Sequence, residues 1–166
     1  MVILERINNL FKKGVSLNLI QLIQKGVVCF LDVRNRNEAI LQLVNALGDA
    51  GEIQERELFF DAILKREQIV STGIGMGVAI PHAKLQCFNH FFLAVGIQKV
   101  KKGIEWDALD GAPVRLIFMI GGPNDQQTNY LKILSNLTVA IKDENRRINI
   151  LSSESREQVI ALFQEN

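Results

Sequence analysis

The segment Ser71–Lys84, with the sequence STGIGMGVAIPHAK, contains the side chain best suited to chemistry in this chain. Three glycines at alternate positions precede a short apolar run that ends at Pro81 and His82. A neutral imidazole is a competent nucleophile near pH 7, because the unperturbed pKa of histidine is about 6.5. Pro81 fixes its own φ angle and so stiffens the backbone that carries His82. An isolated histidine would favour a structural interpretation, but this glycine–proline context favours a reactive imidazole.

The glycine pattern is not typical of nucleotide binding. A dinucleotide fingerprint requires G-x-G-x-x-G between a strand and a helix. Here Val78 and Ile80 favour extended structure after the glycines, and Pro81 disfavours helix at Ile80. No Gly-Lys-Ser/Thr follows, which excludes a P-loop. We therefore interpret the glycines as residues that let the backbone turn or let other groups approach closely.

The composition excludes several classes of function. The 166 residues carry 19 basic and 18 acidic side chains, and the net charge of +1 gives no reason to expect nucleic acid as a partner. No apolar run approaches the roughly 18–20 residues of a membrane-spanning helix. Glu5 and Arg6 interrupt the apolar pattern that a signal peptide would need. Cys29 and Cys87 are too few for a disulfide framework, so we expect a cytoplasmic protein with reduced thiols.

One set of residues could suggest a metal site, namely His82, Cys87 and His90. Their spacing matches no common zinc motif, and a fourth ligand is missing. We therefore expect no metal and no cofactor, and we expect a structural role for His90.

Strands alternate with helices along the chain. Continuous apolar runs predict buried strands over residues 27–33, 91–100 and 114–120. Helical periodicity and capping residues predict helices over the first dozen residues, after Asn35, over about 54–66 with Leu58 buried, after the turn GGPNDQQ, and after Ser155. Leu41 is expected on the buried face of the second of these helices, and RINIL, residues 147–151, as a short final strand. This order predicts an α/β fold, a single layered domain with a mixed, mostly parallel sheet flanked by helices.

A longer stretch, LKREQIVSTGIGMGVAIPH, resembles the signature of enzyme IIA domains of the mannitol/fructose class in the bacterial phosphoenolpyruvate-dependent phosphotransferase system. The flanking FFDAILKRE and GIEWDALDGAPVRLIFMI are similar to the same family, most closely to its nitrogen-regulatory branch. The likeness covers roughly residues 17–163. It implies an EIIA type-2 domain over residues 17–166 behind an N-terminal helical extension over residues 1–16, and a five-stranded sheet.

The resemblance also implies a phosphotransferase component with a phosphohistidine intermediate. His82 would be the acceptor, forming a tele-phosphohistidine, and the histidine phosphocarrier protein would be the donor. The family pattern places an arginine near the active histidine, here Arg66, and its guanidinium fork suits phosphate oxygens. On sequence alone Arg66 would be interpreted as a solvated helix end.

Several neighbouring groups could support the phosphoryl group. The hydroxyls of Ser71 and Thr72 could donate hydrogen bonds to it, or could simply shape the turn. Backbone N–H groups around Gly75 and Gly77 could help equally well.

Tyr130 departs from the family pattern, because many members carry a second histidine at this position. A tyrosine hydroxyl can donate a hydrogen bond, but it cannot replace an imidazole in proton transfer near neutrality. Core packing explains Tyr130 equally well. Three functions stay open: a regulatory module whose partner contacts are switched by phosphorylation, a relay to a sugar-transport IIB domain, and a degenerate binding module that accepts no phosphoryl group. The nitrogen-branch likeness favours the first.

Overall fold

The computed structural model describes residues 19–164, so the expected helix over the first dozen residues and the proposed 1–16 extension lie outside the described residues. Residues 19–25 are helical and lead into the first strand. The elements that follow are β1 (Val27–Leu31), α2 (Arg36–Asp49), α3 (Arg56–Ile69), β2 (Gly73–Gly75), β3 (Val78–Ala79), β4 (His82–Lys84), β5 (Phe92–Gln98), β6 (Leu116–Gly122), α4 (Gln127–Lys142), α5 (Glu144–Ser152) and α6 (Arg156–Gln164). Between residues 19 and 164, no helix is both long and apolar enough to cross a bilayer.

The strands form one mixed sheet in the order β1-β5-β6-β3-β2, with β4 also paired with β6. β1 runs parallel to β5, and both β3 and β4 run parallel to β6. The β5–β6 and β2–β3 pairs are antiparallel. The expected mixed, mostly parallel sheet is therefore confirmed. It has six strands rather than five because Ile80 and Pro81 separate β3 from β4, which pair with successive parts of β6.

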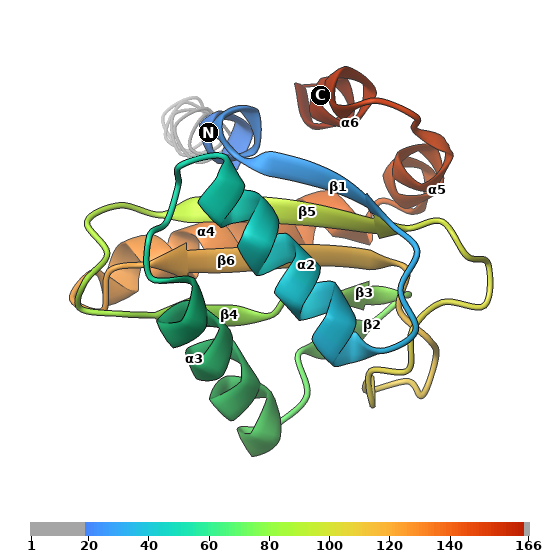
Figure 1. The fold of residues 1–166 in the computed structure, drawn as a ribbon. Coiled ribbons are helices and arrows are strands. Elements are labelled where there is room, and N and C mark those ends of the chain that lie inside the picture. The colour runs from blue at the N-terminus through green and yellow to red at the C-terminus, as the bar shows by residue number, and fades with distance from the viewer. Residues whose placement is uncertain (1–18, 165–166) are drawn as a thin grey trace, which may run out of the picture.

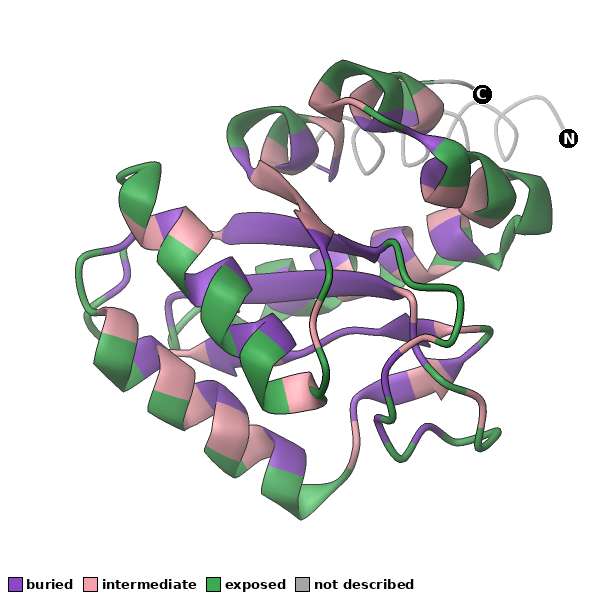
Figure 2. Cartoon of the chain, turned by 45° about the vertical axis from the view of Figure 1, so that its right-hand side comes forward, coloured by how far each residue is buried: buried purple, intermediate pink, exposed green. Residues whose placement is uncertain are grey.

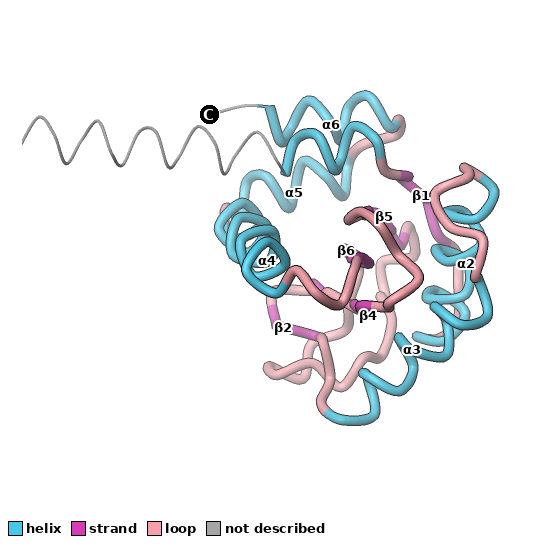
Figure 3. Tube along the Cα trace, turned by 90° about the vertical axis from the view of Figure 1, so that its left-hand side faces the viewer, coloured by secondary structure: helices cyan, strands magenta, loops and turns pink. Residues whose placement is uncertain are grey.

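Helices cover both faces of the sheet (Figure 1). Seen from the side, α2 and α3 lie on one face, and α4, α5 and α6 lie on the other (Figure 3). The two central strands, β5 and β6, are buried along their whole length (Figure 2). Their side chains alternate between two cores: Met119 joins the cluster under α2 and α3, whereas Phe118 and Ile120 join the cluster under α4 to α6.

Capping residues set two helix starts as the sequence predicted. The Asn35 side chain accepts a hydrogen bond from the Glu38 N–H at 2.9 Å, and the Glu38 carboxylate accepts from the Arg34 N–H at 2.9 Å. Ser155 likewise accepts from the Gln158 N–H at 3.2 Å, at the start of α6. These caps fix where α2 and α6 begin.

Three local expectations were wrong. Leu41 and Leu58 are 44% and 52% exposed, because they lie at the edge of the apolar faces that α2 and α3 turn toward the sheet. Residues 147–151 belong to helix α5 rather than to a strand. Asp143 caps this helix by accepting a hydrogen bond from the Arg146 N–H at 3.0 Å. This cap favours a helix, although the apolar residues of the segment alternate as they would in a strand.

Candidate phosphoryl-transfer site

His82 is the first residue of β4 and pairs with Ile120 of β6, so the central strand positions it. The β2–β3 hairpin precedes it in the chain. The turn of that hairpin contains Gly75, Met76 and Gly77, with φ angles of 94°, 59° and 73°. This left-handed region costs glycine little, which explains why the turn is rich in glycine. The chain can therefore reverse tightly just before the segment that carries the imidazole.

The His82 imidazole is held by its own backbone. Its Nδ1 atom lies 2.9 Å from the carbonyl oxygen of Ile80. A carbonyl oxygen can only accept, so Nδ1 carries the proton and Nε2 carries the lone pair. Burial lowers the pKa of His82 below 6.5, and the positive charges of Arg66 and Lys84 act in the same direction, while the hydrogen bond to Ile80 and the Glu67 charge oppose it. The ring is therefore neutral at pH 7.

His82 lines a cleft of about 650 Å³ between α3, β4 and the start of α4. The lining includes the basic Lys65, Arg66 and Lys84 together with His82, Gln127 and Tyr130. Within the described part of the chain, no acidic side chain lines this cleft. Three cations in a cleft lining without acidic side chains favour an anionic ligand. The first turn of α4, which also contains no acidic residue, adds the partial positive charge of a helix N-terminus.

Arg66 reaches the cleft from the last turn of α3. Its Nη1 atom donates a hydrogen bond to the Val70 carbonyl at 2.9 Å, which anchors the guanidinium at the end of the helix. Its charge influences the pKa of both His82 and Tyr130. The structure thus brings Arg66, His82 and Tyr130 together in one cleft.

Lys84 is a cleft residue that the sequence reasoning missed. It lies two residues after His82 on β4, and alternate residues of a strand point to the same side. Its Nζ atom lies 4.7 Å from the centroid of the Tyr130 ring and donates a hydrogen bond to the Gln127 side chain. The sequence spacing His-x-Lys within an extended run was the signal that could have identified it.

Tyr130 is packed beside the imidazole. The two ring centroids are 5.5 Å apart, and Tyr130 is only 5% exposed. Its hydroxyl is the only fully buried side-chain nitrogen or oxygen in residues 19–164 without a hydrogen-bond partner. Burial raises the pKa of Tyr130 to about 12, although the Arg66 charge acts in the opposite direction. The hydroxyl therefore keeps its proton at neutral pH and is available as a donor.

Other predicted site residues lie outside the cleft lining. The Ser71 hydroxyl donates to the Trp106 carbonyl at 2.7 Å, and the Thr72 hydroxyl donates to the Glu67 carboxylate. Gly75 and Gly77 form the hairpin turn. None of these four residues is among those that line the cleft in the described chain.

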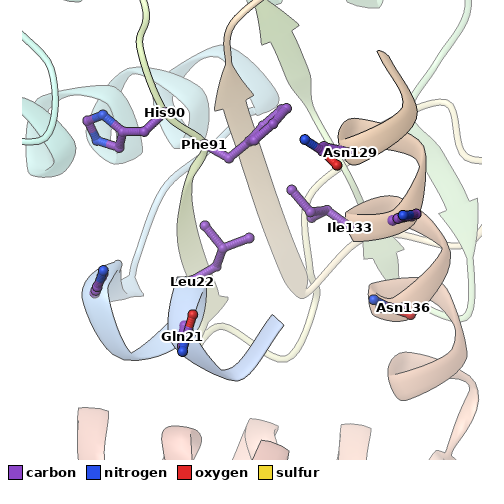
Figure 4. A pocket seen from close by; sticks show the side chains of 9 residues that line it. Gln21, Leu22, His90, Phe91, Asn129, Ile133 and Asn136 are labelled. Carbon is purple, nitrogen blue, oxygen red and sulfur yellow. The ribbon is translucent and has the colours of Figure 1, made fainter. Parts of the chain in front are cut away.

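A second hollow of about 400 Å³ lies between helical residues 19–25, the segment before β5, and α4 (Figure 4). Leu22, Phe91 and Ile133 form its apolar side, and His90 stands at its edge. It shares no lining residue with the cleft of His82. His90 also lies 3.4 Å from a Glu52 carboxylate oxygen at the surface. Among residues 19–164, no cluster of three His, Cys, Asp or Glu side chains could hold a metal ion.

Comparison with known proteins places this chain in one family. The family model described as "Phosphoenolpyruvate-dependent sugar phosphotransferase system, EIIA 2" matches residues 21–166. The fructose-specific EIIA component of Haloferax volcanii is 36% identical over 121 residues, covering 73% of this chain and 77% of that protein. The fructose-specific EIIABC component of Bacillus subtilis is 33% identical over 136 residues, which are 82% of this chain but only 21% of that longer protein.

Solved structures agree with this relationship. The crystal structure of the nitrogen regulatory protein IIA-Ntr from Neisseria meningitidis superposes with a TM-score of 0.75 at 26% identity, covering 84% of this chain and 93% of that chain. IIA mannitol in its complex with phosphorylated IIB mannitol from Escherichia coli shares the fold, with a TM-score of 0.70 at 20% identity over 84% of this chain and 94% of that chain.

The chain belongs to the EIIA type-2 family of the phosphoenolpyruvate-dependent phosphotransferase system. It is a phosphoryl-carrier IIA protein and therefore a phosphotransferase component. The resemblance noted from its sequence is confirmed, and so is the implied α/β fold, with six strands in place of five.

Proposed function

We propose that this IIA protein accepts a phosphoryl group on Nε2 of His82 from the histidine phosphocarrier protein, in the cytoplasm. The observation that carries the proposal is the hydrogen bond from Nδ1 to the Ile80 carbonyl. It leaves the nucleophilic lone pair on Nε2, on a ring that lines a cleft with three cations. The free thiols of Cys29 and Cys87 are consistent with a reducing compartment.

The transfer needs no proton to move. The Nε2 lone pair attacks phosphorus while the bond between phosphorus and the donor's imidazole nitrogen breaks. The electron pair of that bond returns to the donor ring, which leaves neutral because its other nitrogen keeps a proton. His82 retains its Nδ1 proton and its ring becomes positively charged. The Ile80 carbonyl stabilises this charge by accepting the Nδ1–H hydrogen bond.

The basic residues stabilise the phosphoryl oxygens. Phosphoryl transfer asks a protein mainly for alignment and for charge around the equatorial oxygens. Arg66 offers a planar fork of donors, and Lys84 offers a point charge held in place by Gln127 and the Tyr130 ring. The Tyr130 hydroxyl, which has no hydrogen-bond partner among the described residues, would provide a neutral donor in the position of the family's second histidine. Its missing partner would be supplied by a phosphoryl oxygen.

The remaining predicted residues support the site indirectly. Ser71 and Thr72 would fix the start of β2 through their bonds to Trp106 and Glu67. Gly75 and Gly77 would permit the hairpin turn that precedes His82. We therefore propose a shaping role for these four residues rather than direct contact with phosphate.

We propose further that phosphorylation of His82 switches contacts with regulatory partner proteins. Because no proton moves, the transfer would add a net charge of about −1 to the basic cleft, as a dianionic phosphoryl group on a cationic ring. A nitrogen regulatory protein of Klebsiella oxytoca is 36% identical over 110 residues, 66% of this chain and 67% of that protein, and supports this regulatory interpretation. The second candidate is a relay to a IIB domain, which the IIA mannitol complex with phosphorylated IIB mannitol favours.

The decisive experiment supplies the protein with phosphoenolpyruvate, the general phosphotransferase enzyme and the phosphocarrier. We expect a mass increase of one phosphoryl group that is acid-labile and base-stable, and that is absent from His82→Ala. An unlabelled wild-type protein would instead indicate a degenerate binding module. Adding IIB domains to the labelled protein separates the two candidates, because a relay would lose its label to an acceptor and a switch would retain it.

A further inference from the structure

A buried carboxylate, Glu67, contacts Thr72 just before the β2–β3 hairpin that precedes His82. Its side chain is 1% exposed, and Arg36 Nη1 lies 3.8 Å from Oε2. Thr72 donates twice to this carboxylate, from its backbone N–H at 3.2 Å and from its hydroxyl. Burying a carboxylate is costly unless it is well paired and hydrogen-bonded. The Glu67 carboxylate therefore holds Thr72 in place, and through Thr72 it holds the residues that Thr72 contacts.

Thr72 constrains the peptide that orients the imidazole. Its carbonyl accepts a hydrogen bond from the Ile80 N–H at 3.0 Å, and the Ile80 carbonyl accepts from His82 Nδ1 at 2.9 Å. Trp106 Nε1 donates to the Thr72 hydroxyl oxygen at 3.3 Å and holds it from a second side. An unbroken series of contacts thus runs from Glu67 through Thr72 and Ile80 to His82.

The same carboxylate is also tied to the cationic side of the site. Glu67 follows Arg66 directly in α3, and successive helical residues point about 100° apart. One turn of helix therefore directs a guanidinium to the cleft and a carboxylate to the core. A shift of Thr72 against α3 would move Ile80 and His82 relative to Arg66.

We propose that Glu67 and Thr72 are positioning residues that hold the Ile80 carbonyl in register with α3, so that His82 keeps its Nδ1–H tautomer and faces Arg66. This inference rests on the proposed role of His82 as phosphoryl acceptor. The negative charge of Glu67 also favours the positively charged ring that the transfer creates, consistent with the direction in which it moves the pKa of His82. Glu67 acts through other residues and does not line the cleft.

The test combines ¹⁵N NMR of the histidine ring with phosphorylation rates, on the full chain. Glu67→Gln replaces one acceptor oxygen by an amide that faces donors of Thr72 and Arg36. Thr72→Val removes the hydroxyl and keeps the shape. At pH 8, where the ring is neutral, we expect wild-type His82 to be almost entirely the Nδ1–H tautomer. Both variants should populate the two tautomers comparably and be phosphorylated about tenfold more slowly.

Two controls separate positioning from general destabilisation. Thr72→Ser restores the hydroxyl and should stay within about twofold of the wild-type rate. Ile63→Val destabilises α3 at a fully buried position outside this series of contacts, and it should leave the tautomer unchanged. The proposal would be overturned if Thr72→Val kept the wild-type tautomer of His82 and the wild-type phosphorylation rate. It would also be overturned if Ile63→Val lost the tautomer preference and the rate to the same extent as Thr72→Val. If Glu67→Gln fails to fold, the comparison of Thr72→Val with Thr72→Ser decides. An unlabelled wild-type protein would refute the acceptor role alone, because the tautomer remains measurable.

Discussion

The imidazole of His82 and the carbonyl of Ile80, two residues apart in sequence, are joined by a 2.9 Å hydrogen bond that assigns the two ring nitrogens different roles. Because Nδ1 donates in this bond, only Nε2 can attack phosphorus. We therefore expect the phosphorylated protein to show ³¹P–¹⁵N coupling to Nε2 of His82. A coupling to Nδ1 would mean that the bond to Ile80 breaks during transfer, which would contradict the proposed geometry.

The lowered pKa of His82 predicts a specific dependence of stability on pH. The folded protein binds the proton less readily than the unfolded chain, whose histidine titrates near 6.5. Between the lower folded pKa and 6.5, the unfolded state carries more protons, so the free energy of unfolding falls as pH falls through this window. Above pH 6.5 the protonation of His82 no longer changes the free energy of unfolding. Below the folded pKa its effect on the slope of that free energy against pH vanishes. Urea unfolding of wild type and His82→Asn at several pH values should show the slope in this window reduced by the substitution, and equal slopes would refute the expectation.

Removing a cleft cation should slow phosphorylation without unfolding the protein. We expect Arg66→Met to lower the rate about ten- to hundredfold, since a charge-assisted hydrogen bond contributes about 1.5–3 kcal/mol. Lys84→Met should cost less, about three- to tenfold, because a single point charge is replaced. Lys132→Met is the matched control, because Lys132 is an exposed lysine that lines the second hollow and not the cleft. Rates equal to those of Lys132→Met would show that the cleft charges do not act on the phosphoryl group.

Tyr130→Phe should separate stability from function. Within residues 19–164 the hydroxyl has no hydrogen-bond partner, so its removal should leave the free energy of unfolding unchanged or raise it by about 1 kcal/mol. The phosphorylated form should lose a hydrogen bond, so phosphorylation should raise the Tm of wild type more than that of the variant. Thermal unfolding of both forms measures this difference. A variant that is less stable before phosphorylation would indicate a core-packing role for the hydroxyl instead.

The segment that carries the proposed acceptor could be recognised from sequence because its determinants are local. The ring of Pro81, the glycines before it and the imidazole of His82 are consecutive in the chain, and each has a strong backbone preference. The starts of α2 and α6 were predictable for the same reason, since a cap involves residues only three apart.

The supporting half depends on contacts between distant segments. Glu67 has the sequence context of a solvated helix residue, and only the approach of Thr72 and Arg36 buries it. Lys84 becomes a cleft residue because α4, more than forty residues later, brings Gln127 and Tyr130 against it. Helix α5 was mistaken for a strand because Ile148 and Ile150 alternate, although only Ile150 is buried.

The gap at Ile80 and Pro81 has a consequence for how this chain could evolve. The Pro81 carbonyl accepts the hydrogen bond from the Ile120 N–H of β6, whereas Ile80 faces the opposite side, where its N–H bonds to the Thr72 carbonyl and its own carbonyl accepts from the imidazole. A descendant in which another backbone N–H took the Ile80 oxygen would have a more regular sheet but would lose the bond that sets the tautomer of His82. Selection for phosphoryl transfer would therefore preserve this irregularity.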